Sequence, residues 1–300
     1  DLASTNPPEV SDGHRCDAAG RLLIGPNGVV YRYDEAGRLA EIAPPDTSST
    51  TFEYGPDGLL LADHGPTGDR TFTHDLAGRV DSITLDGAGT TTIAYDDAGR
   101  RASDTSPDGT HTLYRWNALD QLIAIERTSP DGTIERVTID VDALGRPQRI
   151  NGRTVGYDPI AGTPNLIGDV HIVTLGALSW RSDDESWGRN VPGTPEGLRI
   201  GGLTLLGARI YDPTTRQFLS PDPLATVPAS NGAASAYTYA WHDPISFIDP
   251  TGMRPVSIEE YDAIRQREEQ GRVGQAWEAI KQDPWGTLAA VGVVALGVGL

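Results

Sequence analysis

The sequence of 300 residues contains one cysteine, few positive charges and none of the common catalytic motifs. The single cysteine, Cys16, excludes an intrachain disulfide framework and any metal site built from several cysteines. The six histidines show neither an HExxH motif nor another short paired spacing, so no metal or other cofactor is expected. No Ser-His-Asp pattern or phosphate-binding loop is present, which disfavours an enzyme that acts on an external substrate.

Positive charge is scarce, with 24 Lys and Arg against 42 Asp and Glu and a formal net charge of −18. Contacts to phosphates need clustered Lys and Arg, so nucleic acid is not expected as a partner. Solubility is the simplest reason for the acidity, and an acidic lumen that holds a basic cargo is the alternative. The 35 glycines and 22 prolines argue against long helices and favour short strands joined by tight turns.

A seven-residue motif recurs through the first half of the chain. Its copies are CDAAGRL (16–22), YDEAGRL (33–39), YGPDGLL (54–60), HDLAGRV (74–80), YDDAGRR (95–101), WNALDQL (116–122) and VDALGRP (141–147). The aromatic residue ends a strand, Asp-x-x-Gly forms a turn, and the next apolar residue opens the return strand. Copies follow one another about every 20 residues, a period typical of stacked structural repeats.

One such hairpin cannot bury its apolar face alone and must stack on its neighbours. We therefore expect residues 10–250 to form one continuous, curved antiparallel sheet, with helix confined to residues after 254. A β-sandwich would explain the strands but not the fixed period. The aromatic residues of the repeats should stack in register along one face, to bury area between neighbouring units. They are Tyr33, Tyr54, Tyr95 and Trp116.

A different motif follows after the repeat breaks down near residue 154. Residues 206–223 read LGARIYDPTTRQFLSPDP. Together with the repeats, this run resembles the RHS-repeat or YD-repeat proteins with an RHS-associated core domain, which include polymorphic toxins, Tc-toxin C subunits and, distantly, teneurins. The resemblance implies a mainly β fold: a spiralling antiparallel β-hairpin shell with a C-terminal core plug, followed by a short α-helical linker. Arg216-Gln217 departs from the family, which has Gly-Arg there.

The family's cleavage signature, P-x-x-x-x-D-P-x-G-L, has its counterpart near the end of this core. Its positions are filled by Pro244, Asp249, Pro250, Gly252 and Met253. The resemblance implies a single cut of the bond between Met253 and Arg254, an aspartic-type self-cleavage that uses Asp222 and Asp249. We expect the two carboxyl groups to lie together, one protonated to polarise the carbonyl and one ionised to activate water.

Asp-Pro pairs are also ordinary turn formers, and spacing alone favours a turn role for both aspartates. The leucine-to-methionine change in the signature conserves volume, so Met253 is expected to occupy an apolar pocket.

These features divide the chain into three parts. Residues 1–153 are a segment of the repeat shell, residues 154–253 are the end of the shell and the core, and residues 254–300 begin a helical linker and a C-terminal toxin. Because the sequence starts at Asp1 without a signal peptide and stops inside an apolar run, we expect a piece of a longer protein. A capping box at Ser257 and Glu260 predicts the start of the linker helix.

The resemblance implies a secreted or cell-surface bacterial carrier that encloses a variable toxin and releases it by self-cleavage, in bacterial competition or virulence. Its implied partners are its own C-terminal segment, a secretion apparatus or shell-completing protein, and an immunity protein. The alternative is a non-cleaving structural or adhesive surface protein. A membrane contact is expected only through the apolar run 288–300, which is shorter than a bilayer span of about 20 residues. That run is equally compatible with a buried helix of the cargo or an effect of truncation.

Overall fold

A computed structural model describes a little over two thirds of the chain. The described residues are 9–10, 14–25, 28–142, 145–157, 164–168, 170–175, 178–181, 187–189, 198–200, 202–223, 235–249, 251–257, 260, 261 and 263. The chain separates into two compact units, one of residues 1–156 with 164–257 and one of residues 157–163 with 258–300. The sites described below lie in the first unit.

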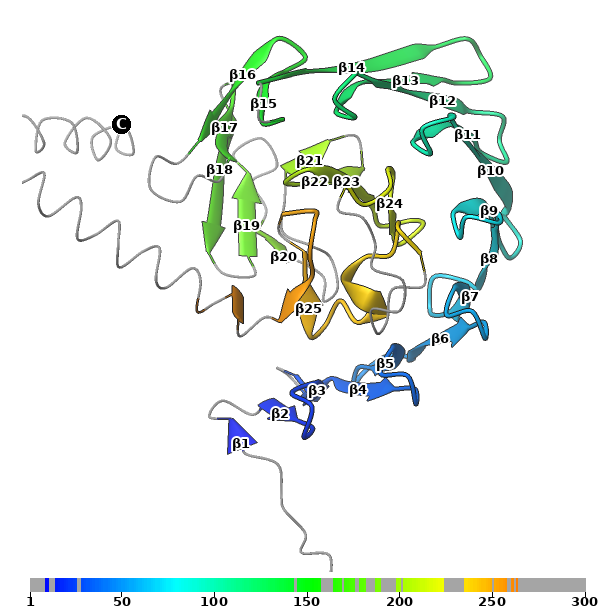
Figure 1. Ribbon diagram of the computed structural model, residues 1–300, viewed down its shortest axis with the longest axis vertical. Coiled ribbons are helices and arrows are strands. Elements are labelled where there is room, and N and C mark those ends of the chain that lie inside the picture. Colours follow the sequence, from blue (N-terminus) through cyan, green and yellow to red (C-terminus); the bar gives the residue numbers. More distant parts are fainter. Residues whose placement is uncertain are drawn as a thin grey trace, which may run out of the picture. The chain divides into compact units, whose positions relative to one another are not determined.

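Twenty short strands form one sheet, which we call the repeat shell. They are β1 (Glu9–Val10), β2 (His14–Cys16), β3 (Leu22–Ile24), β4 (Val30–Tyr33), β5 (Leu39–Ala43), β6 (Thr50–Tyr54), β7 (Leu60–His64), β8 (Arg70–His74), β9 (Val80–Leu85), β10 (Gly89–Tyr95), β11 (Arg101–Thr105), β12 (His111–Trp116), β13 (Leu122–Thr128), β14 (Ile134–Val141), β15 (Pro147–Ile150), β16 (Arg153–Tyr157), β17 (Pro164–Ile167), β18 (Val170–Leu175), β19 (Leu178–Arg181) and β20 (Trp187–Arg189). Successive strands pair antiparallel from β1 to β16, as the predicted hairpin repeat requires. Figure 1 shows them following one another in an arc around β21–β25.

The chain inside this arc forms separate small sheets, which we call the core plug (residues 198–257). Strands β21 (Leu198–Ile200), β22 (Leu203–Leu206), β23 (Arg209–Asp212) and β24 (Gln217–Phe218) make an antiparallel sheet of four, and β25 (Phe247–Ile248) pairs with β26 (Val256–Ser257). A 3-10 helix, η2 (Ala240–His242), lies between them. The mainly β fold, a shell of hairpin repeats with a core plug, is therefore confirmed. Only the expectation that one continuous sheet reaches residue 250 was wrong, because the plug strands pair in sheets of their own. The apolar inner face of the shell needs cover, and a separate sheet supplies it.

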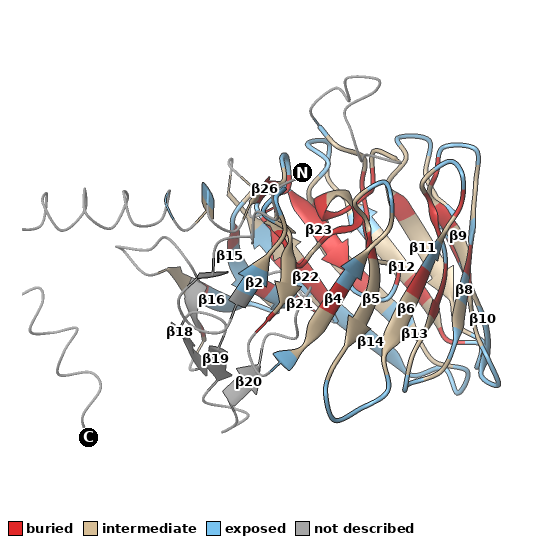
Figure 2. Cartoon of the chain, turned by 90° about the horizontal axis from the view of Figure 1, so that it is seen from below, coloured by how far each residue is buried: buried red, intermediate tan, exposed pale blue. Residues whose placement is uncertain are grey.

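Two apolar clusters join shell and plug. In the first, residues of β4 to β10, such as Phe52 and Phe72, pack with Ile245 of the plug. In the second, Leu122 and its neighbours on β13 and β14 pack against β21–β23, including Ile210. Figure 2 shows that buried residues gather on the plug strands and on the strands facing them, whereas the hairpin ends are exposed. Burial between the two layers is thus the main stabilising contribution to this unit.

The repeat motif builds each turn and joins it to the next unit. In the second copy, Asp34 Oδ1 accepts the amides of Ala36 and Arg38, and Asp34 Oδ2 pairs with the Arg38 side chain. The Arg38 guanidinium lies 4.4 Å from the ring centre of Tyr54 in the next unit, and the Tyr54 hydroxyl donates to Leu39 O. The same contacts recur in three further units, at Asp17–Arg21–Tyr33, Asp75–Arg79–Tyr95 and Asp96–Arg100–Trp116.

The four aromatic side chains do share the face that packs on the clusters, as predicted. The rings do not stack on one another, because a whole hairpin separates one ring from the next. Each ring is instead covered by the arginine side chain of the preceding unit. Cation–π contact and the hydrogen bond from the ring together fix the spacing of neighbouring units.

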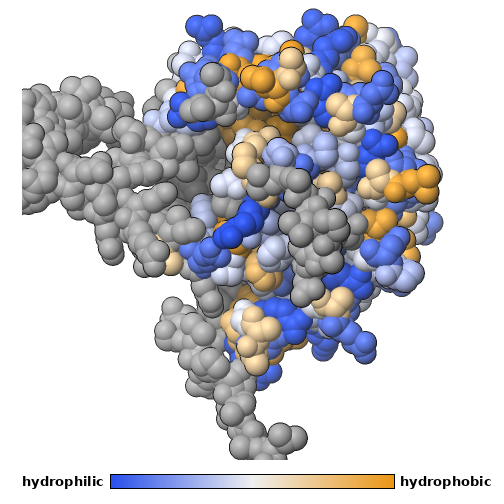
Figure 3. All heavy atoms as spheres, in the orientation of Figure 1, coloured by the Kyte–Doolittle hydropathy of each residue, from blue (hydrophilic) through white to orange (hydrophobic). Residues whose placement is uncertain are grey.

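The surface of the described residues is largely hydrophilic on the side seen in Figure 3. Apolar residues form separate patches there. Among the described residues, no helix is long and apolar enough to cross a membrane. The run 288–300 and most of the predicted linker helix lie outside the described residues, although Glu260, Tyr261 and Ala263 are helical.

Candidate functional site

The two aspartates singled out by the sequence meet at one arginine. Arg209, the first residue of β23, is buried in the plug. Its Nη2 atom lies 3.1 Å from Asp222 Oδ2 and 3.0 Å from Asp249 Oδ2. Asp222 belongs to the Ser-Pro-Asp-Pro segment that follows β24, and Asp249 directly follows β25. The fold therefore brings two carboxylates from distant segments to one guanidinium nitrogen.

Asp249 also binds the predicted scissile peptide. Its Oδ1 atom accepts the backbone amide of Met253 at 3.0 Å and that of Arg254 at 3.1 Å. The Arg254 amide is the nitrogen side of the bond expected to be cut. Arg209 Nε donates to the carbonyl of Gly252. Residues 252–254 are thus held by Asp249 on the amide side and by Arg209 on the carbonyl side, and the same Arg209 binds Asp222.

Two glycines allow this turn to approach the β22–β23 hairpin closely. Gly207 and Gly252 have φ angles of 51° and 65°. A Cβ atom on Gly252 would lie 2.3 Å from Leu206 O, and one on Gly207 would lie 2.3 Å from Thr251 O. Ala208 N donates to Thr251 O at 2.8 Å across the same contact. Only glycine fits at both positions, so the Asp-Pro-Thr-Gly-Met turn is fixed against the strand that carries Arg209.

The charge arrangement differs from the sequence-based expectation in one respect. Repulsion between two carboxylates was expected to keep a proton on one of them, but the guanidinium of Arg209 stands between the two and offsets that repulsion. Burial lowers the pKa of Arg209 below its ordinary value, and both carboxylates act in the opposite direction. The guanidinium carbon also lies 3.6 Å from the ring centre of Phe218. Sequence reasoning assigned Arg209 no role, although it stands in the Leu-Gly-Ala-Arg motif that carried the resemblance.

The remaining predicted site residues have mixed outcomes. Met253 is 40% exposed, so the expected apolar pocket for its side chain is wrong; the contacts that fix this residue are made by its backbone amide. Pro244 is half-buried and lines a small cavity beside Tyr54 and His242. Pro250 lies outside the described residues.

Solvent reaches the two carboxylates unequally. The side chain of Asp222 is 17% exposed, whereas that of Asp249 is 1% exposed. Asp222 is therefore the carboxylate that water can approach, and Asp249 is the one that holds the backbone.

Asp249 also resembles the turn aspartates of the repeats. Asp34 likewise uses one carboxylate oxygen for two amides and the other for an arginine. Two features set Asp249 apart from the repeat turns: its burial, and the origin of its arginine on a distant strand. A second carboxylate on the arginine is also found at Arg100, which binds Asp96 and Asp120, but there the pair is more exposed. A turn role accounts for its amide contacts but not for Asp222.

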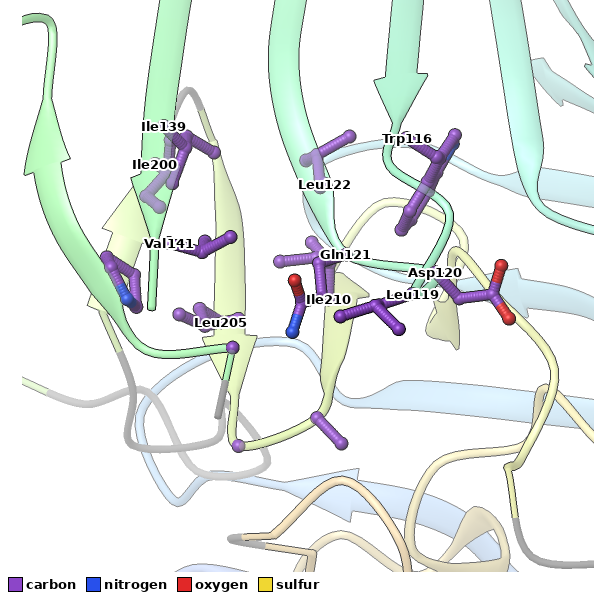
Figure 4. A pocket seen from close by; sticks show the side chains of 14 residues that line it. Trp116, Leu119, Asp120, Gln121, Leu122, Ile139, Val141, Ile200, Leu205 and Ile210 are labelled. Atoms are coloured by element: carbon purple, nitrogen blue, oxygen red, sulfur yellow. The ribbon is translucent and has the colours of Figure 1, made fainter. Parts of the chain in front are cut away.

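A cavity in the described part of the chain lies elsewhere. It has a volume of about 100 Å³ and lies between β12–β15 of the shell and β21–β23 of the plug. Figure 4 shows apolar side chains from both layers around it, including Leu122, Ile139 and Ile210, with Asp120 at one side. Arg209, Asp222 and Asp249 do not line it. The described residues also contain no group of His, Cys, Asp and Glu side chains suited to hold a metal ion.

Comparison with known proteins agrees with the repeat geometry. The family model of the RHS repeat matches residues 33–70 and 95–134. The chain carries RHS repeats. Both matched segments begin at the aromatic residue that opens the seven-residue motif, Tyr33 in one and Tyr95 in the other. No protein of curated function matches the sequence.

Solved structures similar to the RHS-repeat chain include parts of Tc toxins. A crystal structure of TcdB2-TccC3 is 15% identical, with 80% of this chain and 21% of that chain covered and a TM-score of 0.43. The same complex without its hypervariable C-terminal region is 14% identical, with 78% and 19% covered and a TM-score of 0.40. The Photorhabdus luminescens Tc holotoxin pore is 14% identical, with 81% and 17% covered and a TM-score of 0.33. The chain spans about a fifth of the length of these structures. Sequence identities and TM-scores this low carry no argument about its function.

Proposed function

We propose that this chain is the end of a shell-like carrier that cuts itself once, after Met253, and so releases the segment that follows. The observation that supports this most directly is the pair Asp222 and Asp249 on one guanidinium nitrogen, with Asp249 also bound to the Arg254 amide. The released segment is a toxin in this proposal, and the carrier is secreted or surface-bound in a bacterium. Its further partners are a secretion or shell-completing component and an immunity protein.

The cut is a hydrolysis with defined proton transfers. Asp222, the more exposed carboxylate, takes a proton from a water molecule as the water oxygen adds to the Met253 carbonyl carbon. The carbon–nitrogen bond then breaks, and Asp222 returns the proton to the leaving nitrogen of Arg254. Asp249 and Arg209 hold residues 252–254 in place, which turns the attack into a step within one folded unit. The products are a carboxyl group on Met253 and an amine on Arg254.

A specific observation favours the second candidate, a structural shell that does not cleave. The contacts of Asp249 with backbone amides are those of a repeat turn, where no cleavage is expected. In that case Asp222 and Asp249 serve only to neutralise the buried Arg209.

Asparagine variants separate the two functions. Asp222→Asn keeps the side-chain shape but cannot take up the proton. Asp249→Asn can still accept the two amides on Oδ1, but it removes the negative charge and sets an NH2 group against the Arg209 guanidinium, which loosens the hold on residues 252–254. Each should lower the first-order rate of cleavage of the 1–300 chain by at least about a hundredfold while the chain stays folded. The rate is followed by denaturing gel and intact mass after synthesis. Asp75→Asn is the matched control, because Asp75 makes the same turn contacts outside the site and should leave the rate unchanged.

Cleavage of both asparagine variants at the wild-type rate would exclude the catalytic role. Loss of cleavage in the Asp75→Asn control as well would point to a general requirement for repeat turns and equally contradict the assignment.

A further inference from the structure

Two units of the repeat carry a charge where the others carry a core residue. The residue that follows the turn is a buried aliphatic one in four copies, Leu39, Leu60, Val80 and Leu122. In the fifth copy it is Arg101, which is only 2% exposed. Three residues further on, three copies hold Ile42, Ile83 and Ile125, and the third copy has the buried Asp63. The fifth copy has Asp104 there, which is half-buried and accepts the hydroxyl of Tyr114. Buried charges of this kind are retained in proteins only when they are paired.

Both charges find their partners in one short segment of the plug. Arg101 Nη1 lies 2.5 Å from Asp212 Oδ2, and Arg101 Nη2 donates to Thr215 Oγ1 at 3.0 Å. Asp63 Oδ2 accepts from Arg216 Nε at 3.2 Å. Burial by itself lowers the pKa of Arg101, but Asp212 beside it raises the pKa above the usual value.

Arg216 is the residue that departs from the family pattern, and its backbone adopts the left-handed conformation with φ of 57°. Asp63 also pairs with Arg70 of its own layer, so one shell carboxylate serves two arginines.

Apolar contacts alone do not fix the register of a plug in a repetitive shell. Because each unit offers a similar aliphatic surface, a plug shifted by one unit would still bury its apolar face. In such a shifted arrangement Asp212 would face Val80 or Leu122, and Arg216 would face Ile42 or Ile83. A buried charge without a partner costs far more than a buried pair, so a shift that separates Arg101 from Asp212 is strongly disfavoured. Asp63 would keep Arg70 and lose only its second arginine, which makes a smaller contribution.

We propose that Asp63 and Arg101 form a two-charge register key that docks the core plug at one position of the repeat shell. The charges on the two sides are complementary. In the shell, Asp63 is negative and pairs with Arg216 of the plug. Arg101 is positive and pairs with Asp212 of the plug. Such a device gives specificity rather than stability, since apolar residues of similar size would bind as well.

The key also acts on the candidate site, and this part rests on the proposed function. Arg101 N donates to Leu219 O at 2.7 Å, three residues before Asp222. Asp222 N in turn donates to Ala236 O at 3.0 Å. Arg101 is thus a positioning residue for the segment that bears Asp222, and it does not touch the peptide to be cut.

The double variant Arg101→Leu with Asp212→Leu tests the key. Leucine is the residue that four other copies carry at this position. We expect Tm to stay within a few degrees of wild type or rise, because an apolar pair replaces a buried ion pair. Hydrogen exchange should nevertheless become at least tenfold faster at two amides that report docking, that of residue 101 and that of Val80, which donates to Gln217 Oε1 at 3.1 Å. Self-cleavage should slow by tenfold or more.

The matched control is Glu126→Leu with Arg136→Leu, an ion pair between β13 and β14 whose arginine is exposed. It should change neither the exchange of the two amides nor cleavage. Wild-type protection of both amides in the Arg101/Asp212 double variant would overturn the key. Because exchange is measured without cleavage, a wild-type chain that never cuts would remove the proposed function but leave this test intact.

Should the double variant fail to fold, Asp63→Asn supplies the same measurement, because asparagine keeps the shape and one acceptor oxygen but removes the charge and the second acceptor. A several-fold faster exchange at Val80 supports the key, and an unchanged rate overturns it.

Discussion

His242 is buried in an unusual stretch of backbone where the plug meets β6. Ala240, Trp241 and His242 all have positive φ angles, between 48° and 62°. The imidazole packs edge-on against the ring of Tyr54 at 5.2 Å between centroids. Its Nε2 atom has no hydrogen-bond partner within the described part of the chain. Burial lowers the pKa of His242 from 6.5 to about 3, and the nearby charges of Arg38 and Arg216 add to this.

This histidine should make the plug sensitive to acid. As pH falls, the unfolded chain binds a proton on His242 near pH 6.5, whereas the folded chain does so only near pH 3. Its contribution to stability is therefore complete above pH 6.5 and is lost progressively between pH 6.5 and 3. At pH 5 the loss should be about 2 kcal/mol relative to neutral pH.

The measurement is the free energy of unfolding of wild type and His242→Phe at pH 7.5 and 5. Phenylalanine keeps the contact with Tyr54 and removes the titration, so the variant should lose about 2 kcal/mol less than wild type between the two pH values. Equal losses in both proteins would show that His242 does not titrate as its burial predicts.

At the scale of elements, the turn at residues 249–253 differs from the repeat turns in how closely it is approached. Gly252 and Gly132 both have positive φ angles, but only Gly252 has backbone atoms where a Cβ would stand. Gly252→Ala should lower the free energy of unfolding by about 3 kcal/mol or more. A Cβ atom on Gly132 would have no atom within 4 Å. Gly132→Ala should therefore lower the free energy of unfolding by only about 1 kcal/mol, because of its backbone conformation alone.

Denaturant unfolding of the two variants checks this difference. Equal losses for Gly252→Ala and Gly132→Ala would mean that the turn does not lie against Leu206 and Arg209 as the structure has it.

How much of each element the sequence predicts depends on how local its contacts are. Asp34 binds amides two and four residues away, so the motif alone predicts the hairpin and its turn. The separate plug sheet has no such local signal, because its strands read like further shell strands. Arg209 and Asp249 lie 40 residues apart, and no spacing rule connects them. The family motif alone pointed to Asp222 and Asp249. That both bind the guanidinium of Arg209 became apparent only from the fold.

The exposure of the Met253 side chain could likewise not be predicted from local sequence. A sequence motif records that an apolar residue precedes the predicted cut, but not whether the turn directs its side chain inward. Here the backbone amides of Met253 and Arg254 are bound by Asp249, and these contacts place no requirement on the methionine side chain.

At the scale of the whole unit, shell and plug depend on one another. The shell strands have an apolar inner face, and the plug supplies the residues that cover it. The plug carries the candidate site, and the shell holds the neighbouring plug segment. The backbone of Gly78 and Val80 binds the side chain of Gln217, and the amide of Arg101 donates to Leu219 O. A site built in this way forms only when the plug has docked on the shell strands.

The most direct test of this account is the intact mass of the purified wild-type 1–300 chain, combined with N-terminal sequencing of each fragment. Circular dichroism on the same sample confirms that the β shell is folded. The account predicts two fragments that separate under denaturing conditions, one ending at Met253 and the other beginning at Arg254. A folded sample that shows only the mass of the uncut chain, or a fragment that begins at another residue, would contradict it.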